Sequence, residues 1–378
     1  MALTQRYFGV SGAGSMDGTS FANRAPLYVA GSLNSIITGF NFAADSLLCW
    51  IKPGNYTSSQ TIMSGIFSTT APVNSGFGCY FYACDADGNP WQPPNWRSPE
   101  IPTWKADLPI IDHTANSAWL NQSGIHCYGL QVVRSNSSFS ANTGPFNNFA
   151  AVDWCWASVS ANSTSAYCFS AGAQVLKNCG GECSGTSYNA IFVITGSTSL
   201  RNCKAIGNAS ASSGSRAGYT FAINSVVEFT ACSASGVDIG ILNTTSTSGR
   251  SLIEACTLKA ATTGVQSTGA ATTNVNSGIS KSFICAGTYG IQRGLVAPRG
   301  ILNNRLRATT PISAPTEQVQ VNNQTAAGSD AAEFVDATNH DLRIKNTSTY
   351  WGQGLGAGDQ AAAASGTVTG FRNRGIRI

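Results

Sequence analysis

Charged side chains are scarce in this 378-residue sequence. Lys and Arg number 22, Asp and Glu number 18, charged residues make up 11% of the chain and the net charge is +4. An ordinary soluble domain carries roughly 25% charged residues. The small net charge excludes a strongly basic nucleic-acid-binding protein, so no specific nucleic-acid partner is predicted. The scarcity of Lys, Arg and Glu, which are good helix formers, also disfavours a helical protein.

Long hydrophobic runs and histidine are also scarce. No segment approaches the ~20 apolar residues of a membrane span, so no membrane insertion is predicted. Residues 1–10 lack the apolar segment of a secretory signal, which predicts synthesis in a host cytoplasm. The sequence has 3 His and shows no Cys and His spacing typical of zinc sites, so neither a metal nor a cofactor is predicted.

The hydrophobic fraction of the chain, by contrast, is ordinary. It amounts to 42%, enough to bury a core, and 40 residues are glycine. The polar surface must therefore come from Ser, Thr, Asn and Gly, which favour turns and short strands. The composition predicts an all-β protein.

Seven of the 12 cysteines recur at a regular interval. They are Cys127, Cys155, Cys179, Cys203, Cys232, Cys256 and Cys285, with spacings of 28, 24, 24, 29, 24 and 29 residues. A repeat of this length is typical of a solenoid. Apolar patches alternate with turn residues inside each unit, which predicts two or three short strands per coil. One cysteine per coil then predicts a buried ladder of small, reduced side chains.

The repeat resembles right-handed parallel β-helix proteins of the pectate-lyase-like kind. Segments 17–23 and 52–56 are similar to the opening segments of β-helix repeat proteins, and segments 333–336, 340–344 and 354–358 to their closing segments. The resemblance implies a solenoid with about 24 to 29 residues per coil. The expected organisation is an N-terminal arm and cap (1–30), a β-helix (31–358) and a basic C-terminal tail (359–378).

Residues 85–109 interrupt the repeat. They contain 6 of the 13 prolines together with Trp91, Trp96 and Trp104. Proline cannot donate to a strand ladder, so a loop projecting from the solenoid is predicted. Trp154 and Trp156 flank Cys155, and alternation places both indoles outside if the thiol is inside. These five tryptophans are candidates for a partner or glycan contact, with packing under the loop as the alternative.

Catalytic groups are few in the regular coils. Glu228 and Glu254 lie 26 residues apart and could face one side of neighbouring coils, but scattered surface acids are the preferred interpretation. Lys177, Arg201 and Lys204 lie near that face and could serve as the base of a lyase, but a solvated face is the preferred interpretation. The segment 85–89 has oxygen ligands but lacks the spacing of an EF-hand, so a turn is the preferred interpretation. No catalytic residue is predicted.

Basic residues gather toward the C-terminal end of the solenoid. The candidates for docking onto an acidic surface are Arg293, Arg299, Arg305, Arg307, Arg372, Arg374 and Arg377. A merely solvated basic end is the alternative.

A signal-less β-helix poor in charge, with an N-terminal arm and a basic tail, resembles bacteriophage virion components. The resemblance implies a non-catalytic protein of the virion, a head decoration (cement) protein or a fibre or spike component. It also implies other virion proteins as partners, a trimer as the homo-oligomer and a host surface glycan as a further ligand. The alternatives are a tailspike-like polysaccharide depolymerase or glycan-binding receptor protein, and a bacterial surface adhesin.

Overall fold

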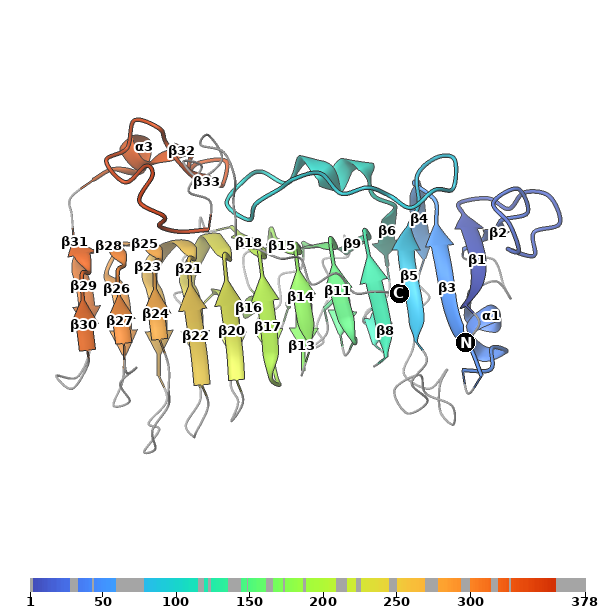
Figure 1. The fold of residues 1–378 in the computed structure, drawn as a ribbon, viewed down its shortest axis with the longest axis horizontal. Coiled ribbons are helices and arrows are strands. Elements are labelled where there is room, and N and C mark those ends of the chain that lie inside the picture. Colours follow the sequence, from blue (N-terminus) through green and yellow to red (C-terminus); the bar gives the residue numbers. More distant parts are fainter. Residues whose placement is uncertain are drawn as a thin grey trace.

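The chain winds into a solenoid whose successive coils stack their strands in parallel (Figure 1). The computed structural model describes residues 3–27, 33–42, 44–58, 78–114, 119–121, 124–134, 144–147, 149–160, 166–172, 174–185, 188–208, 216–221, 226–244, 250–268, 278–293, 300–313, 319–325 and 328–357. Within these ranges no helix is long and apolar enough to cross a membrane. The predicted right-handed parallel β-helix is confirmed.

One side of the solenoid is a 13-stranded sheet, here called sheet A. In spatial order its strands are β2 (Ala25–Pro26), β1 (Leu3–Gly9), β3 (Ser46–Ile51), β5 (Cys79–Ala83), β8 (Ile125–Tyr128), β11 (Ala151–Asp153), β14 (Val175–Lys177), β17 (Thr198–Arg201), β20 (Val226–Thr230), β22 (Arg250–Glu254), β24 (Gly278–Ser280), β27 (Gly300–Leu302) and β30 (Val319–Val321).

The other sides form an 18-stranded sheet, here called sheet B. In chain order its strands are β4 (Asn55–Ser58), β6 (Ile110–His113), β7 (Leu120–Asn121), β9 (Gln131–Arg134), β10 (Phe146–Asn147), β12 (Trp156–Val159), β13 (Phe169–Ala171), β15 (Gly180–Cys183), β16 (Ala190–Ile194), β18 (Lys204–Gly207), β19 (Ala217–Phe221), β21 (Ser233–Asn243), β23 (Thr257–Ser267), β25 (Phe283–Ala286), β26 (Tyr289–Arg293), β28 (Arg305–Arg307), β29 (Thr310–Ser313) and β31 (Gln324–Thr325). The long strands β21 and β23 run through two sides of their coils.

From β8 to β30, the coils turn out of sheet A through one residue in the left-handed backbone conformation. Asn178 and Asn202 have φ angles of 51° and 54° at this position. Asparagine tolerates this conformation better than most residues. The side chains of the two stack, since Nδ2 of Asn202 donates to Oδ1 of Asn178 at 2.7 Å.

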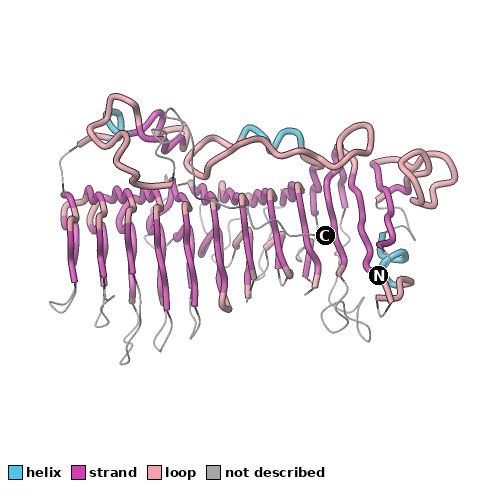
Figure 2. Tube along the Cα trace, viewed as in Figure 1, coloured by secondary structure: helices cyan, strands magenta, loops and turns pink. Residues whose placement is uncertain are grey.

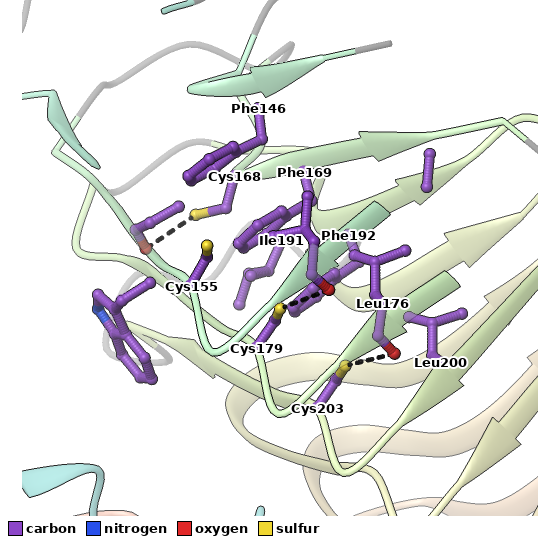
Figure 3. Packing of buried hydrophobic residues seen from close by; sticks show 14 of the residues in the cluster. Phe146, Cys155, Cys168, Phe169, Leu176, Cys179, Ile191, Phe192, Leu200 and Cys203 are labelled. Carbon is purple, nitrogen blue, oxygen red and sulfur yellow. Dashed lines mark hydrogen bonds between the residues drawn. The ribbon is translucent and has the colours of Figure 1, made fainter. Parts of the chain in front are cut away.

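The cysteine directly after this turn points into the coil. Five of the predicted ladder cysteines occupy this position, all fully buried and free: Cys155, Cys179, Cys203, Cys232 and Cys256. Figure 3 shows three of these thiols above one another. The thiol of Cys179 donates to the carbonyl of Lys177 at 3.0 Å. The ladder therefore lines the inside of the turns and partly satisfies the turn carbonyls.

The other two predicted ladder cysteines lie elsewhere, which corrects the prediction. Cys127 is in register with Phe81 and Val152, three positions earlier in its coil, where Leu130 takes the turn position. Cys285 packs outside the coil against Phe334, and Ser282 takes its turn position. The spacing alone could not reveal these offsets, because coils differ in loop length.

Aromatic rings form a second interior ladder on sheet B. Phe146, Phe169, Phe192 and Tyr219 stack with centroid separations of 5.0, 4.8 and 4.9 Å (Figure 3). These separations match the ~4.8 Å spacing of neighbouring strands. Each coil is thereby locked in register with the next.

The ends of the chain differ from the predicted boundaries. Residues 1–30, expected to be an arm and cap, include β1, which pairs with β3 in sheet A, so the solenoid begins there. The short helix α1 (Leu33–Thr38) follows. The last solenoid strand described is β31. The predicted tail, 359–378, lies outside the described residues.

Two segments lie along one edge of the solenoid, at the top of Figure 2. The first is the proline-rich segment 85–109 with its 3-10 helix (Thr103–Asp107). The sequence predicted that this segment projects from the solenoid. The structure shows that it lies along the coils instead. The second is the closing segment 328–357, with α3 (Asp330–Glu333), β32 (Phe334–Asp336) and β33 (Asp341–Ile344). The two meet where the amide of Leu342 donates to the carbonyl of Pro99 at 2.9 Å.

Candidate functional site

The outer face of sheet A carries a group of partly exposed aromatic and titratable side chains. Side chains alternate along each strand, so Cys79 and Phe81 of β5 are buried while Tyr80 and Tyr82 point outward. In β8 the alternation buries Cys127 and turns His126 and Tyr128 outward. The sequence pattern that buries the core thus also sets an aromatic face toward solvent.

One register position of this face forms a row that continues through Thr230 and Glu254, and its seven residues from β1 to β17 are here called the outer row. From β1 to β17 it consists of Tyr7, Trp50, Tyr82, Tyr128, Asp153, Lys177 and Arg201. Strands lie ~4.8 Å apart, so the six intervals give the outer row a length of about 29 Å. Four aromatic residues are followed by an acid and two cations.

The rings of the outer row contact one another closely. The centroids of Trp50 and Tyr82 lie 6.0 Å apart, and those of Tyr82 and Tyr128 lie 5.3 Å apart. Beside them, Tyr80 stacks on His126 at 4.9 Å. The rings of Tyr80, Tyr82 and Tyr128 are partly exposed, whereas Trp50 is buried. The exposed rings form an apolar surface with hydroxyl groups at its edges, the kind that packs against a sugar ring.

Asp153 begins the charged half of the outer row. It is in register with Tyr128 on one side and with Lys177 on the other, and Arg201 follows Lys177. Nδ2 of Asn178 donates to Oδ1 of Asp153 at 2.9 Å and fixes the orientation of the carboxyl group. One carboxyl oxygen therefore has a protein donor, and two cations lie on the next strands.

The segment 85–109 supports this carboxyl group from behind. Asn202 donates to Asn178 at 2.7 Å and to the carbonyl of Trp96 at 3.0 Å. In turn, Oδ1 of Asn202 accepts from the amide of Ser98 at 2.5 Å. Asp153 is thus tied through two asparagines to the segment that borders this edge of sheet A.

Burial shifts the acid–base behaviour of this group of residues. It raises the pKa of Asp153, while the bond from Asn178 and the charge of Lys177 oppose the rise. It raises the pKa of Tyr128 to about 12, to which the charge of Asp153 adds, and that of Tyr82 to about 12. It lowers the pKa of His126. Shifted pKa values that cluster on one surface are typical of a functional site.

The five candidate tryptophans form a buried cluster beside the outer row, where the ring centroid of Trp91 lies 6.0 Å from that of Tyr128. Trp91, Trp96 and Trp104 pack against Trp154 and Trp156, with centroids of neighbouring rings 5.3–6.3 Å apart. All five side chains are 0–9% exposed. Alternation does turn Trp154 and Trp156 away from Cys155, but the segment 85–109 covers them. The five tryptophans therefore pack under the segment 85–109, as the alternative interpretation had it. The prediction of a glycan or partner contact is wrong, because their rings are buried.

Of the predicted charged residues, Lys177 and Arg201 lie in the outer row, whereas Lys204 does not. Lys204 belongs to sheet B and is fully buried under the segment 85–109. Glu228 and Glu254 lie on the adjacent strands β20 and β22, offset by two positions, since Glu254 is in register with Thr230. Glu254 forms an ion pair with Lys281 at 3.2 Å.

The predicted docking arginines are only partly available. Arg305 is 1% exposed and lies 3.9 Å from the ring centroid of Tyr350. Arg307 forms an ion pair with Asp330. The closing segment therefore covers both, which corrects their assignment to a docking surface. The side chain of Arg293 and all of Arg299, Arg372, Arg374 and Arg377 lie outside the described residues.

The turn at 85–89 is stabilised by hydrogen bonds within the turn itself. Oδ1 of Asp85 accepts from the amides of Asp87 and Asn89, each at 2.9 Å. These bonds lower the pKa of Asp85. Over the part of the chain that the structure describes, no group of three or more His, Cys, Asp or Glu side chains could hold a metal ion.

The sequence did not reveal Tyr82, His126 and Tyr128 as site residues. A signal for them existed, because each alternates with a buried Cys or Phe in a short strand. Their alignment into one row could not be foreseen, since it depends on how the intervening loops set the register of β5, β8 and β11.

Comparison with known proteins gave matches among solved structures alone. No family model and no curated protein matches the chain. A crystal structure of the pectate lyase Pel9A matches with a TM-score of 0.45 and 13% identity over 92% of this chain and 90% of that one. A rhamnogalacturonan lyase matches with a TM-score of 0.41 and 11% identity over 94% of this chain and 99% of that one.

These two matches correct the functional prediction. Both structures are of polysaccharide lyases by name, and these names stand against the predictions of a non-catalytic virion protein and of no enzyme. The predicted virion location and partners stay untested predictions. The order and parallel pairing of its own strands show that the chain is a parallel β-helix protein, and the two lyase structures are similar to it in architecture.

Proposed function

We propose that the outer row binds an extended acidic polysaccharide and that its charged half cleaves the chain by β-elimination. The observation that carries the proposal is the continuity of Tyr82 and Tyr128 with Asp153, Lys177 and Arg201 in one register. Aromatic faces pack against sugar rings, and cations pair with carboxylates. An extended row about 29 Å long suits a polymer rather than a single sugar.

The composition of the charged half favours elimination over hydrolysis. Glycoside hydrolysis uses two carboxyl groups about 5 to 9.5 Å apart. Among the described outer-row residues from Tyr7 to Arg201, Asp153 is the only acid. Glu228 lies on β20, three strands from β11, or about 14 Å away. One carboxylate flanked by two cations instead suits removal of a proton next to a uronate carboxylate.

Each group then has a role in the step. The Asp153 carboxylate removes the proton from C5 of a uronate unit, and its raised pKa makes it a stronger base than an ordinary carboxylate. The electron pair forms the C4–C5 double bond while the C4–O bond breaks. The phenol of Tyr128, kept protonated by a pKa of about 12, donates its proton to the departing oxygen. Lys177 and Arg201 hold the uronate carboxylate as charge builds up on it.

The test is a cleavage assay on a panel of uronate-containing and neutral polysaccharides, read by absorbance of the C4–C5 unsaturated product. Asp153→Asn should lower the rate by about 10²–10⁴-fold, since it removes the base but keeps the shape. Asp87→Asn, at an exposed aspartate, is the matched control and should leave the rate unchanged. Cleavage that yields saturated ends only, or full activity in Asp153→Asn, would contradict the elimination mechanism.

A further inference from the structure

A separate pocket lies at the C-terminal end of the solenoid. It has a volume of about 680 Å³, within the range of small-ligand sites. Its walls are Lys281, Asn303, Asn304, Asn322, Asn323, Gln324, Gln353, Gly354 and Leu355. Six of these residues are carboxamides, one is a cation and none is an acid. The pocket shares no residue with the outer row.

The floor of the pocket is built by the turns of three consecutive coils. Lys281, Asn303 and Asn322 all occupy the left-handed turn position, with φ angles of 50°, 55° and 51°. Their coils are joined by bonds from the amide of Lys281 to the carbonyl of Leu302 at 3.2 Å and from the amide of Asn303 to that of Val321 at 2.9 Å. Three exposed polar side chains therefore lie side by side at strand spacing.

The carboxamides fall into two groups. Asn304 donates to the carbonyl of Ile279 at 3.0 Å, and Asn323 donates to that of Ile301 at 2.7 Å, so both are part of the wall. The side-chain amides of Asn303, Asn322 and Gln324, by contrast, have no hydrogen-bond partner within the described part of the chain. Each of these free amides can both donate to and accept from a ligand.

The closing segment supplies the opposite wall and is firmly attached. The amide of Gly356 donates to the carbonyl of Lys281 at 2.8 Å, and the amide of Ala357 donates to Oγ1 of Thr257 at 2.8 Å. Nε2 of Gln353 donates to the carbonyl of Thr349 at 2.7 Å, which leaves its oxygen for a ligand. The pocket is therefore preformed between two rigid parts of the molecule.

We infer that this pocket binds an acidic monosaccharide unit, a uronate, independently of the outer row. Hydroxyl groups of a sugar both donate and accept, which matches the free carboxamides. The single carboxylate of a uronate matches Lys281, whose ion pair with Glu254 at 3.2 Å is exposed and easily exchanged. The inference stands on the pocket alone and does not require that the protein cleaves a polysaccharide.

The experiment titrates the full chain with glucuronate and with glucose by NMR and calorimetry. The double variant Asn303→Gly and Asn322→Gly removes both amides but keeps a residue suited to the left-handed turn. It should weaken binding of both sugars at least tenfold. Lys281→Met keeps the length of the side chain without its charge, and it should abolish the preference for glucuronate over glucose.

Two further variants locate the binding. Gln92→Ala, at an exposed amide of the segment 85–109, is the matched control and should leave glucuronate affinity unchanged, whereas Lys177→Met, the same change in the outer row, reports any binding there. Loss of binding in Lys177→Met but not in Lys281→Met would place the sugar in the outer row and overturn the inference. So would the absence of saturable binding, or displacement by sulfate with no binding of sugar. Polysaccharide cleavage by Asp153 can succeed or fail without changing these outcomes.

Discussion

At the scale of single residues, Asp153 combines a poor environment for a charge with a well-defined orientation. Burial raises the pKa of its carboxyl group, while Asn178 holds one oxygen at 2.9 Å. A folded structure that disfavours the ionised form of a group gives up stability to keep that group in place. Such residues are typical of functional sites rather than of structural ion pairs.

The raised pKa predicts how the stability of Asp153→Asn depends on pH. The carboxyl group favours the folded state fully below its unfolded pKa, and this contribution is lost as the pH rises through the raised folded pKa. Compared with the wild type, Asp153→Asn should therefore become relatively more stable as the pH rises from 3 to 7. Urea unfolding at a series of pH values measures this difference, with Asp87→Asn as control. A difference that is constant with pH would refute the assigned pKa shift.

At the scale of elements, the segment 85–109 acts as a strap that holds several coils and positions the asparagines behind Asp153. Trp104 anchors it, since it is 2% exposed and its ring lies 5.3 Å from Trp154 and 5.4 Å from Trp96. Lys105 adds a cation 4.5 Å from the ring centroid of Trp156. The tryptophans thus serve the site indirectly, by fixing the backbone from which Trp96 and Ser98 contact Asn202.

Trp104→Ala should lower the free energy of unfolding by about 3–5 kcal/mol, the usual cost of emptying a site of this size. Ile101→Ala, 45% exposed in the same segment, should change it by less than about 0.5 kcal/mol. Chemical denaturation measures both, and limited proteolysis should show faster cleavage within 85–109 for Trp104→Ala alone. Equal effects of the two substitutions would mean that the segment is not anchored by its tryptophans.

Lys204 joins this strap to the closing segment. Its ammonium group is fully buried and donates to the carbonyl of Pro99 at 3.2 Å and to that of His340 at 2.7 Å. Burial lowers its pKa to about 7, while the nearby carboxylates of Asp341 and Glu100 oppose the shift. The neutral amine still has two N–H groups, enough for both carbonyls.

The lowered pKa of Lys204 predicts a stability that rises with pH. Between the folded value of about 7 and the unfolded value of about 10.5, the unfolded chain binds more protons, so the free energy of unfolding increases over this range. Lys204→Met should remove this increase and, because two carbonyls lose their donor, should be less stable at high pH. Urea midpoints from pH 6 to pH 10 for both proteins test this. Parallel curves would show that Lys204 does not titrate in this range.

At the scale of the whole molecule, the fold could be predicted from the sequence because a solenoid repeats its core. Cysteines at similar spacings and alternating apolar patches predicted a repeating coil of short strands. Five of the seven predicted thiols stack inside it as expected. Cys127 and Cys285 could not be placed, because loop length varies and shifts the coil position of a residue. The outer row was missed for the same reason, since it exists only once the register of seven strands is set.

Burial of the tryptophans also lay beyond the sequence. Alternation correctly turned Trp154 and Trp156 away from the core, but only the folded molecule shows that a segment some 50 residues earlier covers them. The alternation within a strand decides which side chains point away from the core. Whether those side chains reach solvent depends on which other segments of the chain cover them.

The most direct test of the account is a crystal structure of Asp153→Asn with a bound oligouronate. The account predicts that the oligosaccharide lies across the strands of sheet A, with a sugar ring against Tyr82 or Tyr128 and a carboxylate paired with Lys177 or Arg201. The substituted side chain should face C5 of the unit at the charged half of the outer row. An oligosaccharide bound along another face of the solenoid, with sheet A empty, would contradict the central claim.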